Sequence, residues 1–100
     1  MLNDAVLLEI AQGVAKRVVA REGKMSDQVT YLYRLCLVRS PTANEVVLVT
    51  KFYESQRKRF SRDPKRAAEV AGAGDDVVES AAWTATARAI LNLDEFLTRK

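Results

Sequence analysis

Apolar residues recur at helical spacing over nearly the whole chain, and the pattern is richest between residues 78 and 98. Because the apolar positions there span a wide arc of a helix, we predict that this helix is buried on more than one side and forms the centre of the core. The alanines at its centre predict that a neighbouring helix crosses close to it. Two stripes make up the arc: Val78, Ala82, Ala85, Ala89, Leu93 and Phe96, and beside them the tryptophan Trp83 with Ile90 and Leu97.

Two helices are predicted in the first part of the chain. The first begins at Asn3 or Asp4, either of which suits the N-cap position, and runs to about Arg21. The second begins at Ser26 or Asp27 and continues for about ten residues. The side chains predicted to face the core are Leu7, Ile10, Val14 and Val18 in the first helix and Val29, Leu32, Tyr33 and Cys36 in the second, with Tyr31 and Arg34 facing outward.

A capping motif marks the start of the third helix. In the capping box Thr42-Ala43-Asn44-Glu45, the Thr42 hydroxyl accepts a hydrogen bond from the Glu45 amide and the Glu45 carboxylate accepts one from the Thr42 amide. This helix runs to about Arg62, and Asp63-Pro64 then opens a short fourth helix that ends near Ala71. We expect the short helix to be a peripheral flap. The inward side chains of the third helix are predicted to be Val49, Phe52, Tyr53, Gln56 and Phe60.

These elements predict an all-α fold. The chain has 100 residues, of which 48% are hydrophobic, as is usual for one globular domain. We therefore expect a single domain over residues 1–100, a small bundle of four to five helices that are mostly antiparallel because their connections are short. Asp76 is expected to cap the last helix. No apolar run approaches the ~20 residues that span a bilayer, so we expect no membrane partner.

Residue types that carry common chemistries are scarce. The chain has no histidine and one cysteine, Cys36, which removes the usual general base and the common zinc ligand sets. We expect Cys36 to be a buried, inert thiol, and we expect no catalytic residue, metal site or cofactor, so the chain is not predicted to be an enzyme. Asp94 and Glu95 lie near the end of the last helix, where the helix dipole disfavours negative charge. Either Arg39 or Arg88 is the expected partner of Asp94.

The strongest charge feature is the stretch from Lys51 to Arg66, with seven basic and two acidic residues. Residues 67 to 98 hold one basic and six acidic residues, so the two segments nearly cancel. We therefore favour a solvated or self-paired basic face, with a small nucleic-acid-binding helical module as the alternative. The candidate nucleic-acid contacts are Arg57, Lys58, Arg59, Arg62, Lys65 and Arg66.

Three motifs carry a resemblance to a known family. They are Met1-Leu2-Asn3-Asp4, the stretch from Tyr33 to Thr42 followed by Glu45, and Ala82-Trp83-Thr84 continuing to Leu91-Asn92-Leu93-Asp94-Glu95-Phe96-Leu97. In this order they resemble the extreme C-terminal segment of large planctomycete proteins that combine a planctomycete-type cytochrome C domain with domains of unknown function. The resemblance covers almost the whole chain and implies a C-terminal helical fragment of a longer, exported protein. It does not imply haem binding, because the chain has neither a Cys-x-x-Cys-His motif nor a histidine.

The sequence predicts the fold more sharply than the function. We expect a non-catalytic accessory or interaction domain that packs against the rest of a parent protein or against a protein partner. Export would place the parent in the periplasm or at the cell surface. If an apolar surface stays exposed, we expect the isolated domain to form a homodimer. Structural roles are predicted for Thr42, Glu45, Trp83, Asp94 and Arg39.

Overall fold

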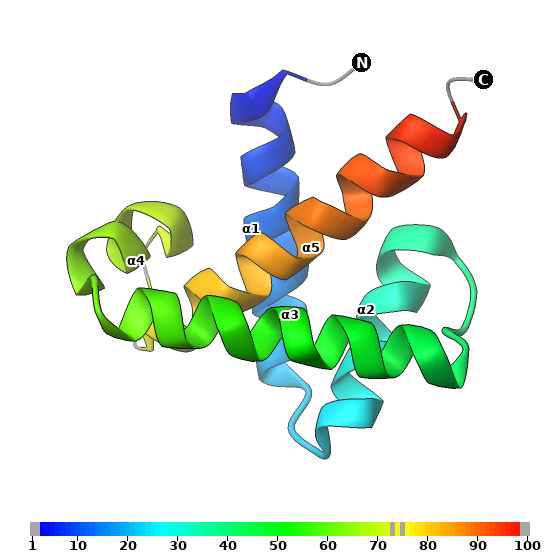
Figure 1. The fold of residues 1–100 in the computed structure, drawn as a ribbon. Helices are drawn as coiled ribbons and strands as arrows, with labels where there is room; N and C mark the ends of the chain where they lie inside the picture. Colours follow the sequence, from blue (N-terminus) through cyan, green and yellow to red (C-terminus); the bar gives the residue numbers. More distant parts are fainter. Residues whose placement is uncertain (1–2, 73, 75, 99–100) are drawn as a thin grey trace.

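The computed structural model describes residues 3–72, 74 and 76–98, with side chains described as far as Leu93. All regular secondary structure in these residues is α-helical, which confirms the all-α class. The helices pack against one another in a small bundle (Figure 1). In chain order they are α1 (Asp4–Ala20), α2 (Met25–Leu37), α3 (Ala43–Ser61), α4 (Pro64–Ala71) and α5 (Val77–Thr98).

Helix α5 lies at the centre of the bundle, as its apolar pattern predicts. It contacts each of the other four helices, and in Figure 1 α3 crosses in front of it and α1 behind it. Ala81, Ala82 and Ala87 are fully buried, and these small side chains let the neighbouring helices approach closely. Trp83 is also fully buried, and its ring stacks on Tyr53 of α3 with ring centroids 4.1 Å apart. The Tyr53–Trp83 pair therefore joins α3 to the core.

The predicted stripe of α5 is wrong toward its C-terminal end. Ala89 and Leu93 are exposed, whereas Thr84 and Thr86 are buried. Each threonine hydroxyl donates a hydrogen bond to the backbone carbonyl four residues earlier, at 2.7 Å. Because this bond satisfies the hydroxyl within the helix, a threonine can be buried there much as a valine would be.

Helix starts largely follow the predicted capping residues. The side chains of Asn3, Asp63 and Asp76 each accept a hydrogen bond from the backbone amide three residues further on, at 2.9, 3.1 and 3.0 Å. Each bond satisfies an amide that has no partner inside its own helix. The capped amides lie at the starts of α1, α4 and α5, so these three starts are determined locally.

Helix α2 differs from its prediction at its start, whereas its end agrees with the prediction. Its N-cap is Lys24, without a side-chain capping bond, rather than Ser26 or Asp27. It continues to Leu37 and ends at Val38, whose φ of 59° places a β-branched residue in the left-handed region. That conformation costs an L-residue roughly 1–2 kcal/mol. Val38 is 88% exposed, so no packing of its side chain compensates.

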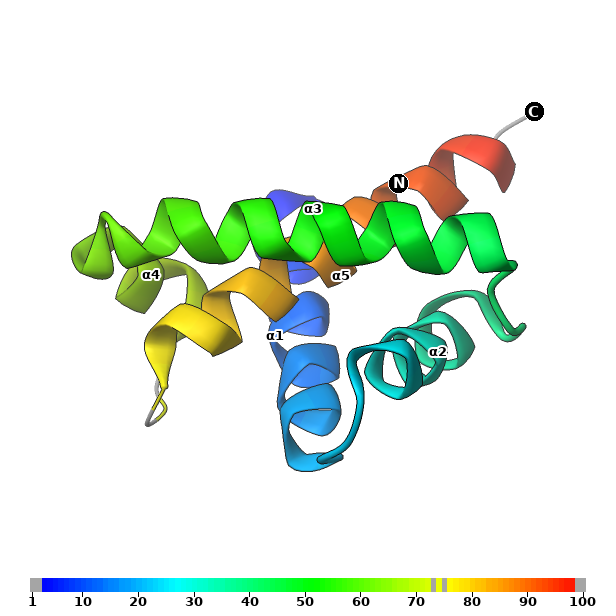
Figure 2. The ribbon, with the colours of Figure 1, turned by 60° about the horizontal axis from the view of Figure 1, so that its bottom comes forward.

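Helix α4 belongs to the core and is not a peripheral flap. Ala67 and Ala71 are buried, and α4 contacts α5, α3 and α1. The Gln12 side-chain amide of α1 donates a hydrogen bond to the Val70 carbonyl at 2.8 Å, close to the end of α4. Figure 2 shows α4 beside the last turn of α3 and the first turns of α5. The short helix therefore closes one end of the bundle.

The inner faces of the remaining helices are mostly as predicted. Val29, Leu32 and Tyr33 of α2 are buried. Ile10 of α1 and Phe52 of α3 were predicted to face the core, but they are 40% and 38% exposed.

Within the described residues, no helix combines the length and the apolar character needed to cross a membrane.

Candidate functional site

An apolar groove lies between α3 and α5, and we call it the α3/α5 groove. It has a volume of about 260 Å³. Its lining is largely aliphatic and aromatic, with a single ionisable carboxylate among the described lining residues. The residues that line it are Tyr33, Glu45, Leu48, Val49, Phe52, Thr86, Ala89, Ile90 and Leu93.

The walls of the groove expose large apolar side chains. Leu48 is 65% exposed, Leu93 52% and Phe52 38%. The spacing of four residues places Leu48 and Phe52 on one side of α3, and the same spacing places Ala89 and Leu93 on one side of α5. Ala89 also lines the groove, and its side chain is a single methyl group. Contiguous exposed apolar surface of this kind is typical of interaction sites.

Glu45 borders the groove at the start of α3, where it is held by Arg39 and Thr42. The Arg39 guanidinium donates two hydrogen bonds to the Glu45 carboxylate, both at 2.8 Å, and the Thr42 amide donates another at 2.8 Å. The Thr42 hydroxyl accepts a bond from the Glu45 amide at 3.1 Å, which confirms the capping box. The Arg39 guanidinium first, and the Thr42 amide second, hold the pKa of Glu45 at about 2.

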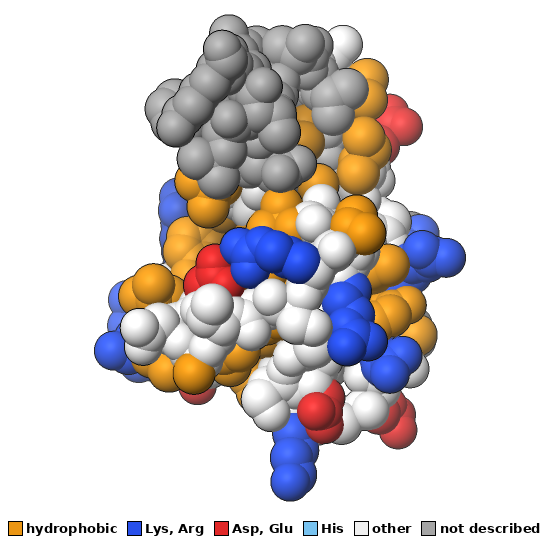
Figure 3. Space-filling model, turned by 90° about the vertical axis from the view of Figure 1, so that its right-hand side faces the viewer, with side chains coloured by type: hydrophobic (Ala, Val, Ile, Leu, Met, Phe, Trp, Pro, Cys, Tyr) orange, Lys and Arg blue, Asp and Glu red, His pale blue; other side chains and the backbone are white. Residues whose placement is uncertain are grey.

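Tyr33 lies beneath this ion pair. The Arg39 guanidinium sits 5.2 Å from the centre of the Tyr33 ring, a cation–π contact. Burial raises the pKa of the Tyr33 hydroxyl, and the neighbouring Glu45 carboxylate raises it further. Figure 3 shows the side of the molecule where α3 begins, with apolar side chains beside adjoining acidic and basic ones. At this end of the groove the charge of Glu45 is thus neutralised by Arg39.

Both arginines expected to pair with Asp94 have other partners. Arg39 binds Glu45, which lies just across the α2–α3 connection. The Arg88 guanidinium lies 3.4 Å from the carboxylate of Asp4, at the start of α1. The side chain of Asp94 lies outside the described residues, so its own pairing stays a prediction. Among the described residues, Glu45 is the ion-pair partner of Arg39, and Asp4 is that of Arg88.

The six candidate nucleic-acid contacts are all exposed, around the end of α3 and the start of α4. They do not share one face, because Arg57, Lys58 and Arg59 are consecutive and leave the helix about 100° apart. Arg66 lies 3.6 Å from Glu69, and no other ion pair joins these six cations to a described residue. Arg57 also interacts with the Tyr53 hydroxyl, so the cations without a partner in the described part of the fold are Lys58, Arg59, Arg62 and Lys65.

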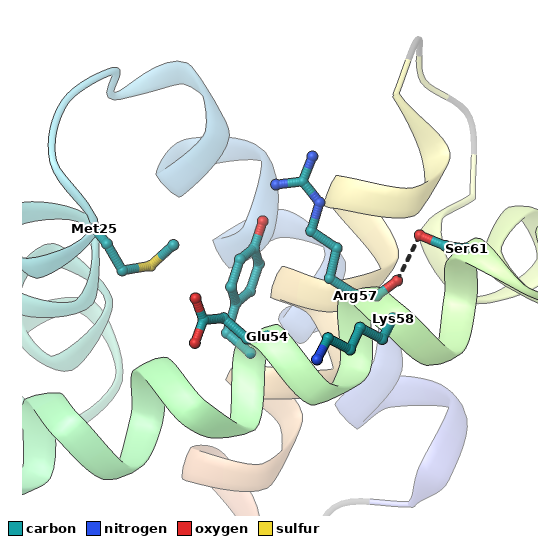
Figure 4. A pocket seen from close by; sticks show the side chains of 6 residues that line it. Met25, Glu54, Arg57, Lys58 and Ser61 are labelled. Carbon is teal, nitrogen blue, oxygen red and sulfur yellow. Dashed lines mark hydrogen bonds between the residues drawn. The ribbon is translucent and has the colours of Figure 1, made fainter.

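A second hollow, of about 410 Å³, opens beside α3 near the start of α2. Figure 4 shows Glu54, Arg57 and Lys58 on its α3 side, with Met25 facing them from α2. The Ser61 hydroxyl donates a hydrogen bond to the Arg57 carbonyl at 2.8 Å, so this hydroxyl is occupied. One carboxylate alongside two cations gives the hollow no uniform charge. The described lining residues carry an excess of one positive charge.

Tyr53 also lines this second hollow, although its side chain is almost fully buried. Burial raises the pKa of its hydroxyl, while the Arg57 guanidinium opposes that shift. The ring of this tyrosine stacks on Trp83 and supports the core. No group of histidine, cysteine and carboxylate side chains able to hold a metal occurs among the described residues. Cys36 is half-buried in α2.

No protein-family model, curated protein or solved structure matches the chain. The function must therefore be inferred from the geometry of its own surface.

The sequence pattern did not predict the α3/α5 groove. Phe52 and Leu93 were assigned to the core, and Leu48 was given no role. A signal was nevertheless present, because residues 46–49 are four consecutive apolar residues, with Phe52 following. One face of a helix cannot bury four consecutive side chains, so some of them had to be exposed or to meet another surface.

Proposed function

We propose that this chain is a non-catalytic helical interaction domain whose α3/α5 groove receives the apolar face of a helix from a protein partner. The observation that carries the proposal is the groove itself, whose lining includes the exposed large apolar side chains of Leu48, Phe52 and Leu93. A groove of this type suits an amphipathic helix that presents apolar residues at positions i, i+3 or i+4, and i+7. The function is therefore binding through apolar contact.

Two further points support the proposal. Glu45 lies at the edge of the groove with its charge neutralised by Arg39, so an apolar partner meets no isolated carboxylate there. The capping box starts α3 at a defined residue, which keeps the α3 wall of the groove in place. The resemblance to the C-terminal segments of large planctomycete proteins favours a domain of a longer, exported protein, in which other parts of the same protein supply the partner.

A selection from a displayed library of helical peptides tests this function without knowledge of the parent. Biotinylated domain serves as bait, and the selected peptides are then measured against two variants. Leu48→Glu places a charge in the groove, and Ile10→Glu places the same charge on an exposed apolar position of α1 that does not line it. We expect selected peptides with helical apolar spacing whose affinity falls at least tenfold for Leu48→Glu only. Failure to select any peptide, or equal affinity for Leu48→Glu, contradicts the proposal.

A nucleic-acid-binding module is the second candidate, because the six exposed cations at the α3–α4 junction have Glu69 as their sole described ion-pair partner. Fluorescence anisotropy with an unrelated DNA duplex, over a series of salt concentrations, tests it. Binding that weakens steeply with salt and is lost in Arg57→Glu/Arg59→Glu supports this candidate. Lys16→Glu/Arg17→Glu is the control, since it makes the same charge change at the end of α1. Flat anisotropy at low salt eliminates the candidate.

A further inference from the structure

We infer that the helix received by the α3/α5 groove is acidic along one side, with carboxylates about two turns apart that meet Lys51 and Arg59 of α3. The inference rests on the proposed function, because it names the chemistry of the partner at the same groove. The partner is then an amphipathic helix of a protein, in which Asp or Glu residues run beside the apolar face. Such a partner is selected by its charge as well as by its apolar residues.

Lys51 borders the α3 wall of the groove. It lies three residues after Leu48 in the same helix, and residues three or four apart are neighbours on a helix surface. Leu48 lines the groove, and Lys51 is exposed. The long stem of a lysine can lie along apolar surface while its ammonium stays in water. A helix seated on Leu48 therefore lies within reach of the Lys51 ammonium.

Arg59 lies farther along the same side of α3. It follows Phe52 by seven residues, so the two side chains leave the helix within about 20° of each other. Arg59 is exposed. It is eight positions from Lys51, about 12 Å along the helix axis, and residues i and i+7 of a partner helix are separated by about 10.5 Å. A helix lying along α3 can thus bring one carboxylate to each cation.

Neither cation forms an ion pair with a carboxylate in the described part of the fold. Glu54 follows Lys51 by three residues without an ion pair between them, and Figure 4 shows Glu54 beside the second hollow. The ion pairs of the described residues are Arg39–Glu45, Arg66–Glu69 and Arg88–Asp4. The charges of Lys51 and Arg59 are therefore available to a partner.

The carboxylate that lines the groove does not attract a cationic partner. Arg39 neutralises Glu45 with two hydrogen bonds of 2.8 Å, so the charge left beside the groove by the described residues is positive. The whole chain also has a net charge of +3, which attracts an acidic partner at longer range. Opposite charges across an interface speed association and discriminate between partners. Charge complementarity therefore favours an acidic helix over a basic one.

The apolar lining favours an acidic helix over a nucleic acid at this groove. Binding to a phosphate backbone is a contact between charges and uses no apolar groove. Leu48 and Phe52 offer exposed apolar surface close to the cations of α3. An amphipathic helix with acidic residues beside its apolar face uses both features at once.

Three synthetic helical peptides test the charge of the partner. They share one length and one row of leucines at positions i, i+3, i+4 and i+7, and they carry Glu, Gln or Lys at the same flanking positions, two turns apart. Fluorescence anisotropy measures their binding to the domain at low and high salt. Exposed ion pairs are weak and screened by salt. At low salt we therefore expect the Glu peptide to bind about threefold more tightly than the Gln peptide and about tenfold more tightly than the Lys peptide, with smaller differences at high salt.

Variants of the domain locate the charge effect. Lys51→Glu/Arg59→Glu should reverse the order, so that the Lys peptide binds most tightly. Lys16→Glu/Arg17→Glu is the matched control, because it makes the same change in net charge at exposed positions of α1 that do not line the groove, and it should keep the order. Leu48→Asn removes apolar surface without adding charge and should weaken all three peptides severalfold. Circular dichroism confirms that each variant is folded.

The outcomes separate this inference from the proposed function. If the three peptides bind equally, or if Lys51→Glu/Arg59→Glu leaves their order unchanged, while Leu48→Asn weakens them, the inference fails and the proposed function stands. If Leu48→Asn weakens none of them, the charges act without the groove and the inference is overturned. If no peptide binds, both fail, and binding of a DNA duplex would then support the nucleic-acid candidate.

Discussion

Replacing Thr42 by alanine removes one capping hydrogen bond and leaves the neighbouring contacts in place. The Thr42 hydroxyl accepts the amide hydrogen of Glu45 at 3.1 Å. The bonds that the Glu45 carboxylate accepts from the Thr42 amide and from Arg39 do not involve this hydroxyl. Thr42 is exposed, so the shorter side chain opens no cavity. The variant therefore tests mainly the N-cap bond, with a smaller effect on the Glu45 carboxylate, whose pKa the Thr42 side chain also lowers.

The expected loss is ~1 kcal/mol in the free energy of unfolding, the usual cost of replacing a threonine N-cap by alanine. For a domain of this length, that loss lowers the Tm by roughly 4–8 °C. The matched control is Thr30→Ala in α2, where the hydroxyl donates to the Ser26 carbonyl at 2.8 Å within the helix. Alanine has the higher helix propensity, so we expect Thr30→Ala to be neutral or more stable by a few tenths of a kcal/mol.

Urea unfolding followed by circular dichroism compares both variants with the wild type. The dependence of the unfolding free energy on urea should be the same in all three, because the surface exposed on unfolding hardly changes. The reasoning is refuted if Thr42→Ala unfolds at the wild-type urea concentration. It is equally refuted if the two threonine variants lose the same stability, since position at the helix start would then have no special effect.

Three further predictions concern other parts of the fold. The pKa of Glu45 is about 2 in the folded state, below its ordinary value of 4.5. The ionised Glu45 carboxylate therefore contributes fully to folding stability above pH 4.5, and this contribution is lost as the pH falls toward 2. The stability difference between wild type and Glu45→Gln, measured by urea unfolding, should therefore narrow over that window; a constant difference contradicts the pKa. Trp83→Ala should lower the free energy of unfolding by ~3–5 kcal/mol in the same measurement, because the removed side chain is fully buried. A decrease below ~1 kcal/mol would show that Trp83 is not central to the core. Val38→Gly should raise the Tm, because glycine adopts a φ of 59° without the strain of a β-branched residue and no buried contact is lost; a lower Tm would refute the strain.

Helix starts could be predicted from the sequence because their signals are local. Thr42 and Glu45 lie three residues apart and form their bonds within one turn. The same is true of Asp63 and Asp76, each of which caps the amide three residues on. A contact that depends on so short a segment is read correctly without knowledge of the fold. The start of α2 could not be predicted in this way, because its N-cap residue, Lys24, makes no side-chain capping bond.

The faces of α5 could not be predicted fully, because hydrophobicity does not separate a surface alanine from a buried threonine. Ala89 and Thr86 are three residues apart, and tertiary packing reverses the exposure their polarity suggests. A threonine hydroxyl that bonds its own helix backbone removes the cost of burial. The α3/α5 groove could not be predicted for a similar reason. An exposed apolar face of a helix and a face buried in the core have the same helical period in the sequence.

The pairing of Arg39 with Glu45 depends on the shape of the α2–α3 connection. The two residues are six positions apart, with Pro41 between them, and no helical or strand spacing brings such a pair together. The dipole of α5 disfavours the carboxylates near its C-terminal end, and for that reason Arg39 or Arg88 was the expected partner of Asp94. In the fold the Arg39 guanidinium makes a bidentate contact with the Glu45 carboxylate.

The central helix of the bundle, α5, is also the last of the five helices to be synthesised. α5 contacts all four other helices and follows them in the sequence, so α1 to α4 are synthesised before their common packing partner exists. Packing α1 against α5 also requires closure of the whole chain between Ala20 and Val77, which slows folding. At roughly 5–20 residues per second, synthesis of the 22 residues of α5 takes roughly one to four seconds. During that interval the inner faces of the earlier helices are exposed to other nascent chains, and the speed of translation limits how long they remain vulnerable to aggregation.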